Sequence, residues 1–429
     1  MFDTIRNAWR IVDLRKKLIY TFIMLIIFRL GSVIPVPLLD PSQLATLFDS
    51  ANNSMFGFID IISGGAFKNA TIFAMSITPY INSSIIMQLL CVAIPALERL
   101  QQEGEEGRKK IGQYMRYGTV ILALIQAVGL YFLLKSYHAI NYTGPEWFAA
   151  VVIIITFTAG TAFLMWLGEQ ITEKGVGNGI SLIIFAGIVS RIPSMVTTVI
   201  AYMQTGGLNW ALLIGFLVFV ILMVGFVVMM NEAERRLPVQ YAKRVVGRKM
   251  YGGQSTHIPI KVTGAGVIPI IFAMSIMAFP GTIASFFGKT ANDGGFWGGF
   301  LKVFSGDSWI YAVLYFLLII FFTYFYTAIQ YNPVEMSNNM KKNGGFIPGI
   351  RPGRPTSDYI AKVLSRVTLA GAIFLGIIAI IPIVMNLFLK IPNLSIGGTS
   401  ILIVVGVALE TVQSIESQML MRHYKGFLE

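Results

Sequence analysis

Few side chains in this sequence could carry out chemistry, and their spacing fits neither a metal site nor a disulfide framework. The only cysteine, Cys91, lies in an apolar stretch, and the three histidines, His138, His257 and His423, are far apart along the chain. Structural and catalytic metal sites usually draw histidine and cysteine ligands from short, regular spacings. We therefore expect no metal, and we interpret these four residues as structural.

Signatures of enzymes are equally weak. The stretch "TGAGVI", which begins at Thr263, has the Gly-x-Gly pattern of a nucleotide-binding loop. Such loops connect a strand to a helix, whereas this one opens an apolar segment, and no Walker-type lysine loop occurs. No Ser/His/Asp set or pair of acids indicates an intramembrane hydrolase. The sequence therefore predicts no enzymatic activity and no cofactor.

Acidic residues are scarce where an ion-coupled transporter would need them. Carboxylates deep in membrane segments bind cations or relay protons. Glu410 and Glu416 lie toward the cytoplasmic end of the last apolar segment, in helical register with Arg422, where an ion pair reaching toward water is the simpler interpretation. Arg29 is expected to extend its guanidinium to the membrane surface in the same way. A secondary transporter of a small solute is kept as the alternative function, and a purely structural scaffold as a third.

The elements that carry these residues are membrane spans. Hydrophobic residues make up 55% of the chain and charged residues 13%, with a mean hydropathy of +0.69, against about 25% charged residues in soluble domains. A bilayer core of about 30 Å needs about 20 apolar residues per helix. Ten stretches qualify: 18–36, 70–94, 117–134, 147–167, 176–201, 208–230, 262–287, 309–329, 367–389 and 400–421.

The fifth stretch is ambiguous because Arg191 and Pro193 interrupt it. A half-span followed by a surface helix fits it as well as a full span. The N-terminal residues before the first stretch show apolar side chains at helical spacing, with charges between them, which predicts a helix in the membrane interface. No small-residue cleavage site follows, so we expect no removable signal peptide.

The distribution of positive charge orients these spans. An even number of spans places both termini on one side, and 26 of the 33 Lys and Arg residues then fall on that side. By the positive-inside rule both termini are cytoplasmic, and anionic lipids would reinforce this orientation. Because each half has an odd number of spans, the two halves are predicted to form an inverted repeat.

Two cytoplasmic loops stand out by their composition. The first, "RRLPVQYAKRVVGRKMYGGQSTHIPIKV", has two β-like stretches around a glycine-containing turn, and it predicts a projecting basic hairpin. The second, "NNMKKNGGFIPGIRPGRPTSDY", combines prolines and glycines into a stiff, exposed tip. Two stiff basic loops on one face predict a docking site for an acidic or RNA-containing partner. Its candidate residues are Lys243, Arg244, Arg248 and Lys249 in the first loop, with Arg351 and Arg354 in the second.

Six stretches together resemble the SecY family, the channel subunits of the general protein translocase, in the family's order and over essentially the whole chain. They are "SGGAFKNATIFAMSITPYINSSIIMQLL", "EEGRKKIGQYMRYGT", "MWLGEQITEKGVGNGIS", "YAKRVVGRKMYGGQSTHIPIKV", "GFIPGIRPGRPT" and "GGTSILIVV". The resemblance implies an all-α membrane protein with ten transmembrane helices in two pseudo-symmetric, inverted halves of five and a short plug helix. It also implies a channel for unfolded polypeptides with a gate that releases apolar segments into lipid.

The resemblance assigns roles to particular residues. It implies a pore ring of isoleucines, which would otherwise be taken as packing residues beside glycine or proline: Ile77, Ile81, Ile180, Ile184, Ile271 and Ile403. It implies a plug at about 56–70 that closes the resting pore, with Ile62, Ser63, Gly64, Gly65, Phe67 and Asn69. The family's lateral gate lies between spans two and three on one side and seven and eight on the other, with Gln88 and Thr263 facing each other.

Two positions depart from the family pattern. Thr263 stands where many relatives carry Asn, and Met115 replaces a polar residue seen in some relatives. The polar cluster that helps to close the family's gate is therefore expected to be weaker in this chain.

The resemblance further implies partners and a location in the cytoplasmic (inner) membrane. They are the SecE and SecG subunits, the SecA motor ATPase, the ribosome, and signal sequences and nascent membrane proteins as substrates; ATP hydrolysis would belong to the motor. The expected organisation is an interfacial helix at 1–17, spans one to five at 18–201, span six at 202–230, the basic loop at 231–261, spans seven and eight at 262–329, the tip loop at 330–366, the last spans at 367–421 and a cytoplasmic tail at 422–429.

Overall fold

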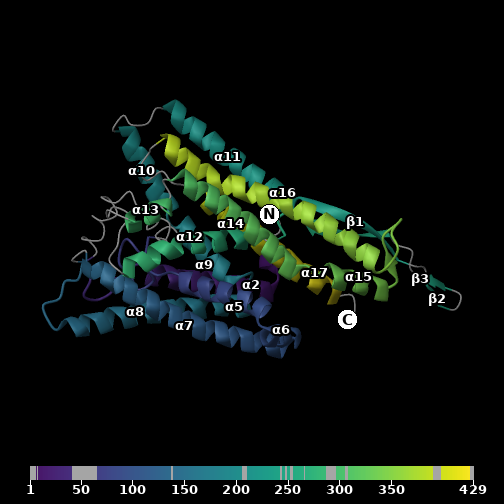
Figure 1. Ribbon diagram of the computed structural model, residues 1–429, viewed down its shortest axis with the longest axis horizontal. Helices are drawn as coiled ribbons and strands as arrows, with labels where there is room; N and C mark the ends of the chain where they lie inside the picture. Colours follow the sequence, from purple (N-terminus) through teal and green to yellow (C-terminus); the bar gives the residue numbers. More distant parts are fainter. Residues whose placement is uncertain are drawn as a thin grey trace.

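Long helices make up most of the protein. The computed structural model describes residues 6, 8–40, 65–136, 139–204, 210–241, 244–246, 249–251, 255–264, 266–286, 296–304, 308–389 and 398–425. In Figure 1 most of the N-terminal helices lie together on one side and most of the C-terminal helices on the other, with α10 drawn apart from the rest of its group. The first group comprises α2 (Val12–Gly31), α5 (Thr78–Ala93), α6 (Pro95–Gln102), α7 (Glu105–Ser136), α8 (Glu146–Lys174), α9 (Gly179–Val189) and α10 (Ile192–Gln204).

The second group contains helices and the short strands that join them. Its helices are α11 (Trp210–Glu232), α12 (Ile268–Phe286), α13 (Phe296–Val303), α14 (Trp309–Gln330), α15 (Pro333–Lys342), α16 (Arg354–Leu389) and α17 (Gly398–Lys425). Its strands are β1 (Glu234–Tyr241), β2 (Arg244–Val246), β3 (Lys249–Tyr251), β4 (Ser255–Lys261) and β5 (Gly345–Phe346).

Every predicted span overlaps a helix, and several helices are long and apolar enough to cross a membrane. Among the described residues there are 5 such helices, or 6 if α5 and α6, bent by 100° at their junction, count as one. Shorter apolar helices occur at Gly179–Ser194, Leu217–Glu232 and Ile268–Gly281. The prediction of a mostly helical membrane protein is therefore confirmed, whereas the count of ten spans is not established by these lengths.

Three boundaries differ from the sequence prediction. Helix α2 runs through position 18 without a break, so the expected interfacial helix and first span are continuous from Val12. The fifth predicted span is two helices, α9 and α10, because the chain turns at Ser190 and Arg191. Pro193 then occupies the first turn of α10, where a missing N–H costs nothing.

The second predicted span also starts later than expected. Helix α5 begins at Thr78, with a proline in its first turn, rather than at position 70. The residues before it form successive turns, and Ala70 and Ser76 have positive φ angles of 48° and 53°. A left-handed conformation at non-glycine residues interrupts a helix, so the apolar run from position 70 is not one helix.

The first basic loop folds as a hairpin that projects beyond the helices (Figure 1). Strand β1 pairs antiparallel with β4, from Glu234 opposite Lys261 to Gln240 opposite Ser255, and β2 pairs with β3 nearer the tip. Strand β5 pairs with the other edge of β1. The two basic loops therefore share one three-stranded sheet.

The tip loop is shorter than predicted. Helix α15 takes up Pro333–Lys342 and α16 begins at Arg354, which leaves residues 343–353 between them. Gly344, Gly349 and Gly353 have positive φ angles there, a conformation that glycine adopts without strain. Beneath the sheet, Leu237, Val239 and Ile260 pack against α15 and α16 in a cluster that also includes Met340, Ile347, Ile360 and Leu364.

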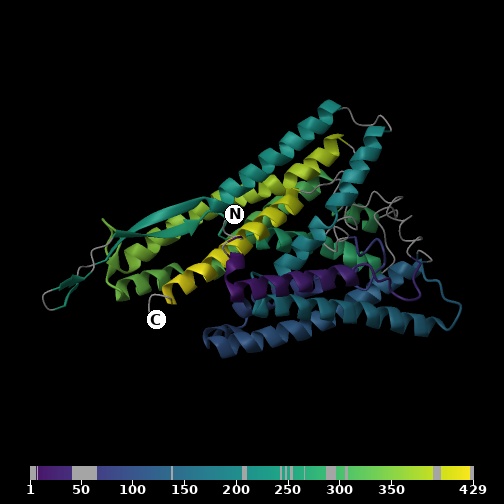
Figure 2. The same cartoon turned by 180° about the vertical axis from the view of Figure 1, so that it is seen from behind.

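The start of α2 contacts the C-terminal half of α17. Leu14 of α2 and Ile415 of α17 belong to a small apolar cluster with Ala8 and Val176. Lys17 Nζ donates a hydrogen bond of 3.2 Å to Gln418 Oε1. Figure 2 shows the start of α2 beside α17, with the C-terminal end of α17 directed toward the same end as the hairpin.

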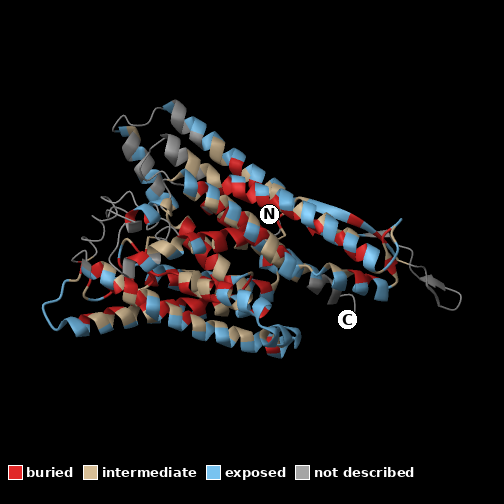
Figure 3. Cartoon of the chain, in the orientation of Figure 1, coloured by how far each residue is buried: buried red, intermediate tan, exposed pale blue. Residues whose placement is uncertain are grey.

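Burial is concentrated between the two helix groups, and apolar side chains face outward. Buried residues gather along the centre of the molecule in Figure 3, where one cluster draws on α2, α5, α8, α9, α11, α12, α14, α16 and α17. Large apolar side chains such as Phe22, Ile121 and Leu222 are exposed on the outer surfaces. A surface with so many exposed apolar side chains suits contact with lipid.

The contact between α8 and α9 gives a first testable prediction. A Cβ on Gly179 would overlap the carbonyl oxygen of Gly168, a backbone atom that cannot rotate away. Gly179→Ala should therefore lower the free energy of unfolding, measured by SDS titration, by about 1–3 kcal/mol, as over-packing does elsewhere. Gly225→Ala on α11, where an added Cβ meets nothing within 4 Å, is the control. Equal stability of both variants would contradict this packing.

Candidate functional site

The six isoleucines singled out by the sequence all belong to one apolar cluster at the contact between the two helix groups. Ile77 and Ile81 come from the start of α5, and Ile184 and Ile403 come from α9 and α17; they are exposed by 1%, 7%, 2% and 2%. Ile180 of α9 and Ile271 of α12 are partly buried and pack against the same cluster. Residues far apart in the sequence thus meet in one buried, apolar region.

Helix α9 is positioned by its cap and by close contact with α8. The side chain of Asn178 accepts hydrogen bonds from the backbone N–H groups of Ile180 (3.1 Å) and Ser181 (3.4 Å), which satisfies two of the free donors at a helix start. The backbone of α9 reaches α8 because Gly179 and Gly168 have no side chains at the contact. Ile180 and Ile184 are therefore fixed by groups outside the apolar cluster.

The start of α12 is tied to α11 and lies against α17. Thr263 Oγ1 donates a hydrogen bond of 2.7 Å to Asn231 Oδ1 at the end of α11. A Cβ on Gly406 would lie 2.9 Å from Val267 Cγ1, so α17 comes close to α12 one turn after Ile403. The contact at Gly406 brings the segment that leads to Ile271 close to the helix that carries Ile403.

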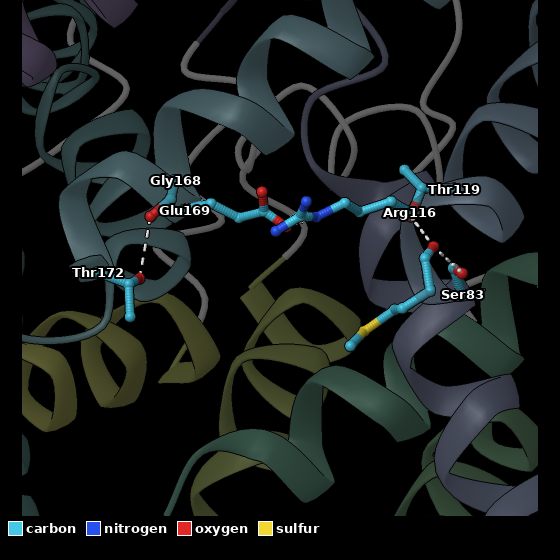
Figure 4. A network of polar contacts seen from close by, with 7 residues as sticks. Ser83, Arg116, Thr119, Gly168, Glu169 and Thr172 are labelled. Carbon is cyan, nitrogen blue, oxygen red and sulfur yellow. Dashed lines mark hydrogen bonds and ion pairs between the residues drawn. The ribbon is translucent and has the colours of Figure 1, made fainter. Parts of the chain in front are cut away.

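A polar network joins the helices on the other side of the cluster (Figure 4). Ser83 Oγ of α5 donates to the carbonyl oxygen of Met115 on α7 at 2.8 Å, and Thr119 Oγ1 donates to the same oxygen at 2.7 Å. Arg116 Nε of α7 lies 2.8 Å from Glu169 Oε1 of α8. In Figure 4 these two side chains extend toward each other from opposite sides.

The network extends from α8 to the start of α9. Thr172 Oγ1 donates to the carbonyl oxygen of Gly168 at 2.9 Å and accepts from the N–H of Gly179 at 2.9 Å. Helices α5, α7, α8 and α9 are thus linked around the apolar cluster. Ser83, Arg116 and Glu169 were not predicted from the sequence, because their partners lie on other helices. Asn178 could have been predicted as a capping residue before an apolar run.

The two predicted gate residues have hydrogen-bond partners away from each other. Helix α12 contacts both α5 and α7, so the expected gate helices do meet. Gln88 Nε2 donates to Ser84 Oγ at 3.4 Å within α5, and its buried Oε1 has no hydrogen-bond partner in the described part of the chain. Thr263 is bonded to Asn231 instead.

The predicted plug is only partly within the described residues. Ile62, Ser63 and Gly64 lie outside them. Gly65, Phe67 and Asn69 lie in turns rather than in a helix. Phe67 is buried in a second apolar cluster, with residues of α7 and α8 such as Ala123 and Phe157.

The predicted docking residues lie at the end of the molecule where the hairpin projects. Arg351 and Arg354 are exposed, at and just after the tip. The tip is held by hydrogen bonds from Thr356 Oγ1 to the Arg351 carbonyl (2.8 Å) and from Ser337 Oγ to the Gly353 carbonyl (2.9 Å). Arg244 and Lys249 belong to strands β2 and β3, whereas Lys243 and Arg248 lie outside the described residues.

The site is a buried apolar cluster. Within the described ranges, no group of three or more His, Cys, Asp and Glu side chains could hold a metal ion, and Cys91 is buried and free. The cluster consists mainly of aliphatic, aromatic and methionine side chains, and the hydrogen-bonded network of Figure 4 lies beside it. A region of this composition disfavours water and ions.

Comparisons with known proteins agree over nearly the whole chain. The family model described as SecY matches residues 71–412. The curated "Protein translocase subunit SecY" of Halalkalibacterium halodurans is 47% identical, and that of Thermotoga maritima 43%; each alignment covers 100% of this chain, with 100% and 98% of the relatives covered.

Solved structures share the fold at low sequence identity. A protein-conducting channel superposes with a TM-score of 0.67 at 20% identity, covering 94% of this chain and 92% of that one. The channel of the canine ribosome–channel complex from the endoplasmic reticulum has a TM-score of 0.62 at 19% identity, with the same coverage. From the family model and the full-length relatives, the chain belongs to the SecY family of protein translocase subunits.

Proposed function

We propose that this chain forms a channel that passes unfolded secretory polypeptides across the cytoplasmic membrane and releases apolar segments sideways into the bilayer. The observation that carries this proposal is the meeting of six isoleucines from α5, α9, α12 and α17 in one cluster between the two helix groups. The family's name as a translocase subunit supports the same function.

An aliphatic ring answers two requirements of such a channel. Many different side chains must pass, which excludes a fixed polar filter, and few ions must leak. A narrow apolar constriction loses its water when it is empty, and flexible isoleucine side chains can close around a chain of varying width. In the resting state a plug, formed by the chain before α5, would add a second barrier.

Lateral release follows from partitioning between the channel and lipid. We assign the gate to the contact of α12 with α5 and α7, beside Gln88 and Thr263. A Leu, Ile, Phe or Val at the centre of a span gains about 0.3–0.6 kcal/mol in the membrane, whereas a charged residue loses about 2.5–3.5 kcal/mol. A segment of about 20 apolar residues therefore prefers lipid, and one or two charges reverse the preference.

The hairpin and the tip loop form the docking surface in this proposal, with both termini on the cytoplasmic side. The two loops share one sheet, and Arg351 and Arg354 are exposed beside it. The SecA motor ATPase or a translating ribosome would bind there, and ATP hydrolysis would belong to the motor. The canine channel with the same fold was solved in complex with a ribosome. SecE and SecG would complete the membrane assembly.

The proposed isoleucine ring predicts that polar substitutions within it increase ion leakage. Replacing Ile81, Ile184 and Ile403 together with serine should raise the ion conductance of the assembled channel in planar bilayers several-fold, because hydroxyl groups allow water to remain in the constriction. Ile153→Ser on α8, a buried isoleucine of the second cluster, is the control for loss of packing. Wild-type conductance in the triple variant, with normal assembly, would refute the ring.

The proposed docking surface predicts that a charge reversal at the tip abolishes motor-driven transport. Arg351→Glu should abolish motor-driven transport into inverted vesicles while the channel still assembles with SecE. Losing one partner of an interfacial charge pair costs about 2–5 kcal/mol of binding free energy, and reversing the charge adds repulsion. Lys110→Glu, the same charge change at an exposed residue of α7, should transport normally. Undiminished transport by the Arg351 variant would exclude this contact.

A further inference from the structure

The chain that leads into α5 is buried between α2 and α8. Among residues 65–77, Ala66, Thr71, Phe73 and Ser76 are nearly inaccessible to solvent. This segment has no regular secondary structure, so packing and a few backbone hydrogen bonds must hold it in place. It ends at Ile77, which is both the first isoleucine of the constriction and the residue that caps α5.

The centre of this segment is the side chain of Phe73, which lies between two other phenylalanines. Its ring is nearly parallel to that of Phe28 on α2, with centroids 6.1 Å apart and an angle of 13°. On its other side the ring of Phe163 on α8 is 6.0 Å away at 8°. Offset stacking at these distances is favourable. We call these three residues the phenylalanine clamp.

Two glycines make room for the clamp, one on each neighbouring helix. A Cβ on Gly31 of α2 would overlap the ring of Phe73. A Cβ on Gly160 of α8 would overlap the carbonyl oxygen of Ile72. Since a backbone carbonyl cannot rotate out of the way as a side chain can, α8 could not approach this segment with any larger residue at position 160.

Backbone hydrogen bonds hold the residues on both sides of the phenylalanine clamp. Before the clamp, the N–H of Ile72 donates to the carbonyl of Ile34 at 3.1 Å and the N–H of Val36 donates to that of Ala70 at 2.9 Å. After it, the N–H of Ser76 donates to the carbonyl of Phe73 at 2.8 Å, with Ser76 in the left-handed region. Only three residues separate Phe73 from Ile77, and this hydrogen-bonded turn joins them.

We propose that Phe73 is a positioning residue for the constriction, and that the phenylalanine clamp fixes where α5 begins and hence where Ile77 and Ile81 point. This inference rests on the proposed role of the isoleucine cluster. The N–H of Ile81 donates to the carbonyl of Ile77 at 3.0 Å, so a displacement of Ile77 moves the first turn of α5 with it. The clamp therefore connects the outer helices α2 and α8 to the residues that close the pore.

The test compares variants of the clamp with matched changes elsewhere. Phe73→Leu and Gly160→Ala should each raise the ion conductance of the assembled channel several-fold, toward that of the triple isoleucine variant. Gly112→Ala on α7, where an added Cβ meets nothing within 4 Å, and Phe226→Leu on α11, which removes the ring partner of Phe374 on α16, should conduct as the wild type does.

A second readout separates positioning from general loss of stability. In a chain with Cys91→Ser and Ile81→Cys, an impermeant thiol reagent reports how open the constriction is at position 81. Adding Phe73→Leu or Gly160→Ala should speed this labelling several-fold, whereas Phe226→Leu should not. If Gly160→Ala does not accumulate, Phe163→Leu changes the clamp at its exposed outer ring and should give the same acceleration.

The outcomes distinguish this inference from the proposed function. Wild-type conductance and labelling in the clamp variants, with leakage in the triple isoleucine variant, would overturn the positioning role alone. A silent triple variant would overturn the isoleucine ring instead. Leakage of equal size from Phe226→Leu would show that any lost aromatic packing opens the channel, and it would also overturn the specific role of Phe73.

Discussion

The structure depends on close packing between aliphatic side chains that offer no directional bond. Dispersion and water exclusion hold an isoleucine cluster together, but they favour many arrangements almost equally. The geometry of the cluster must therefore be set from outside it. In this protein the geometry of the cluster is set by close contacts between helices at Gly168 and Gly179, and by the close contact of Gly406 with Val267. The Asn178 cap also fixes the start of α9.

Polar contacts occupy the periphery for a related reason. An unpaired polar group inside the proposed constriction would hold water or favour one ion over another. Around the isoleucines, the bonds of Ser83 to Met115 and of Thr263 to Asn231 connect helices within one group. The Arg116–Glu169 pair is partly exposed, where an ion pair contributes modestly. The contact between the groups is mainly apolar, which suits the proposed lateral gate.

Some features of the fold could be predicted from the sequence because a physical constraint leaves a pattern there, and others could not. Hydropathy located the helices because lipid demands long apolar runs, and the alternation around a glycine-containing turn located the hairpin. The predicted helix starts were less accurate, because no sequence pattern indicates the left-handed conformation of Ala70 and Ser76. The pairing of Gln88 with Thr263 was expected from resemblance, yet each is bonded elsewhere. Contacts such as Arg116 with Glu169 join distant positions and were not predictable from periodicity.

The shared sheet has a mechanical consequence. Strand β1 follows α11 almost directly, β4 leads through residues 262–267 into α12, and β5 lies between α15 and α16. A partner that pushes on the hairpin would therefore apply torque to several helices together, since seven paired positions join β1 to β4. A small tilt of the hairpin would be transmitted through β4 to α12, the helix that bears Ile271.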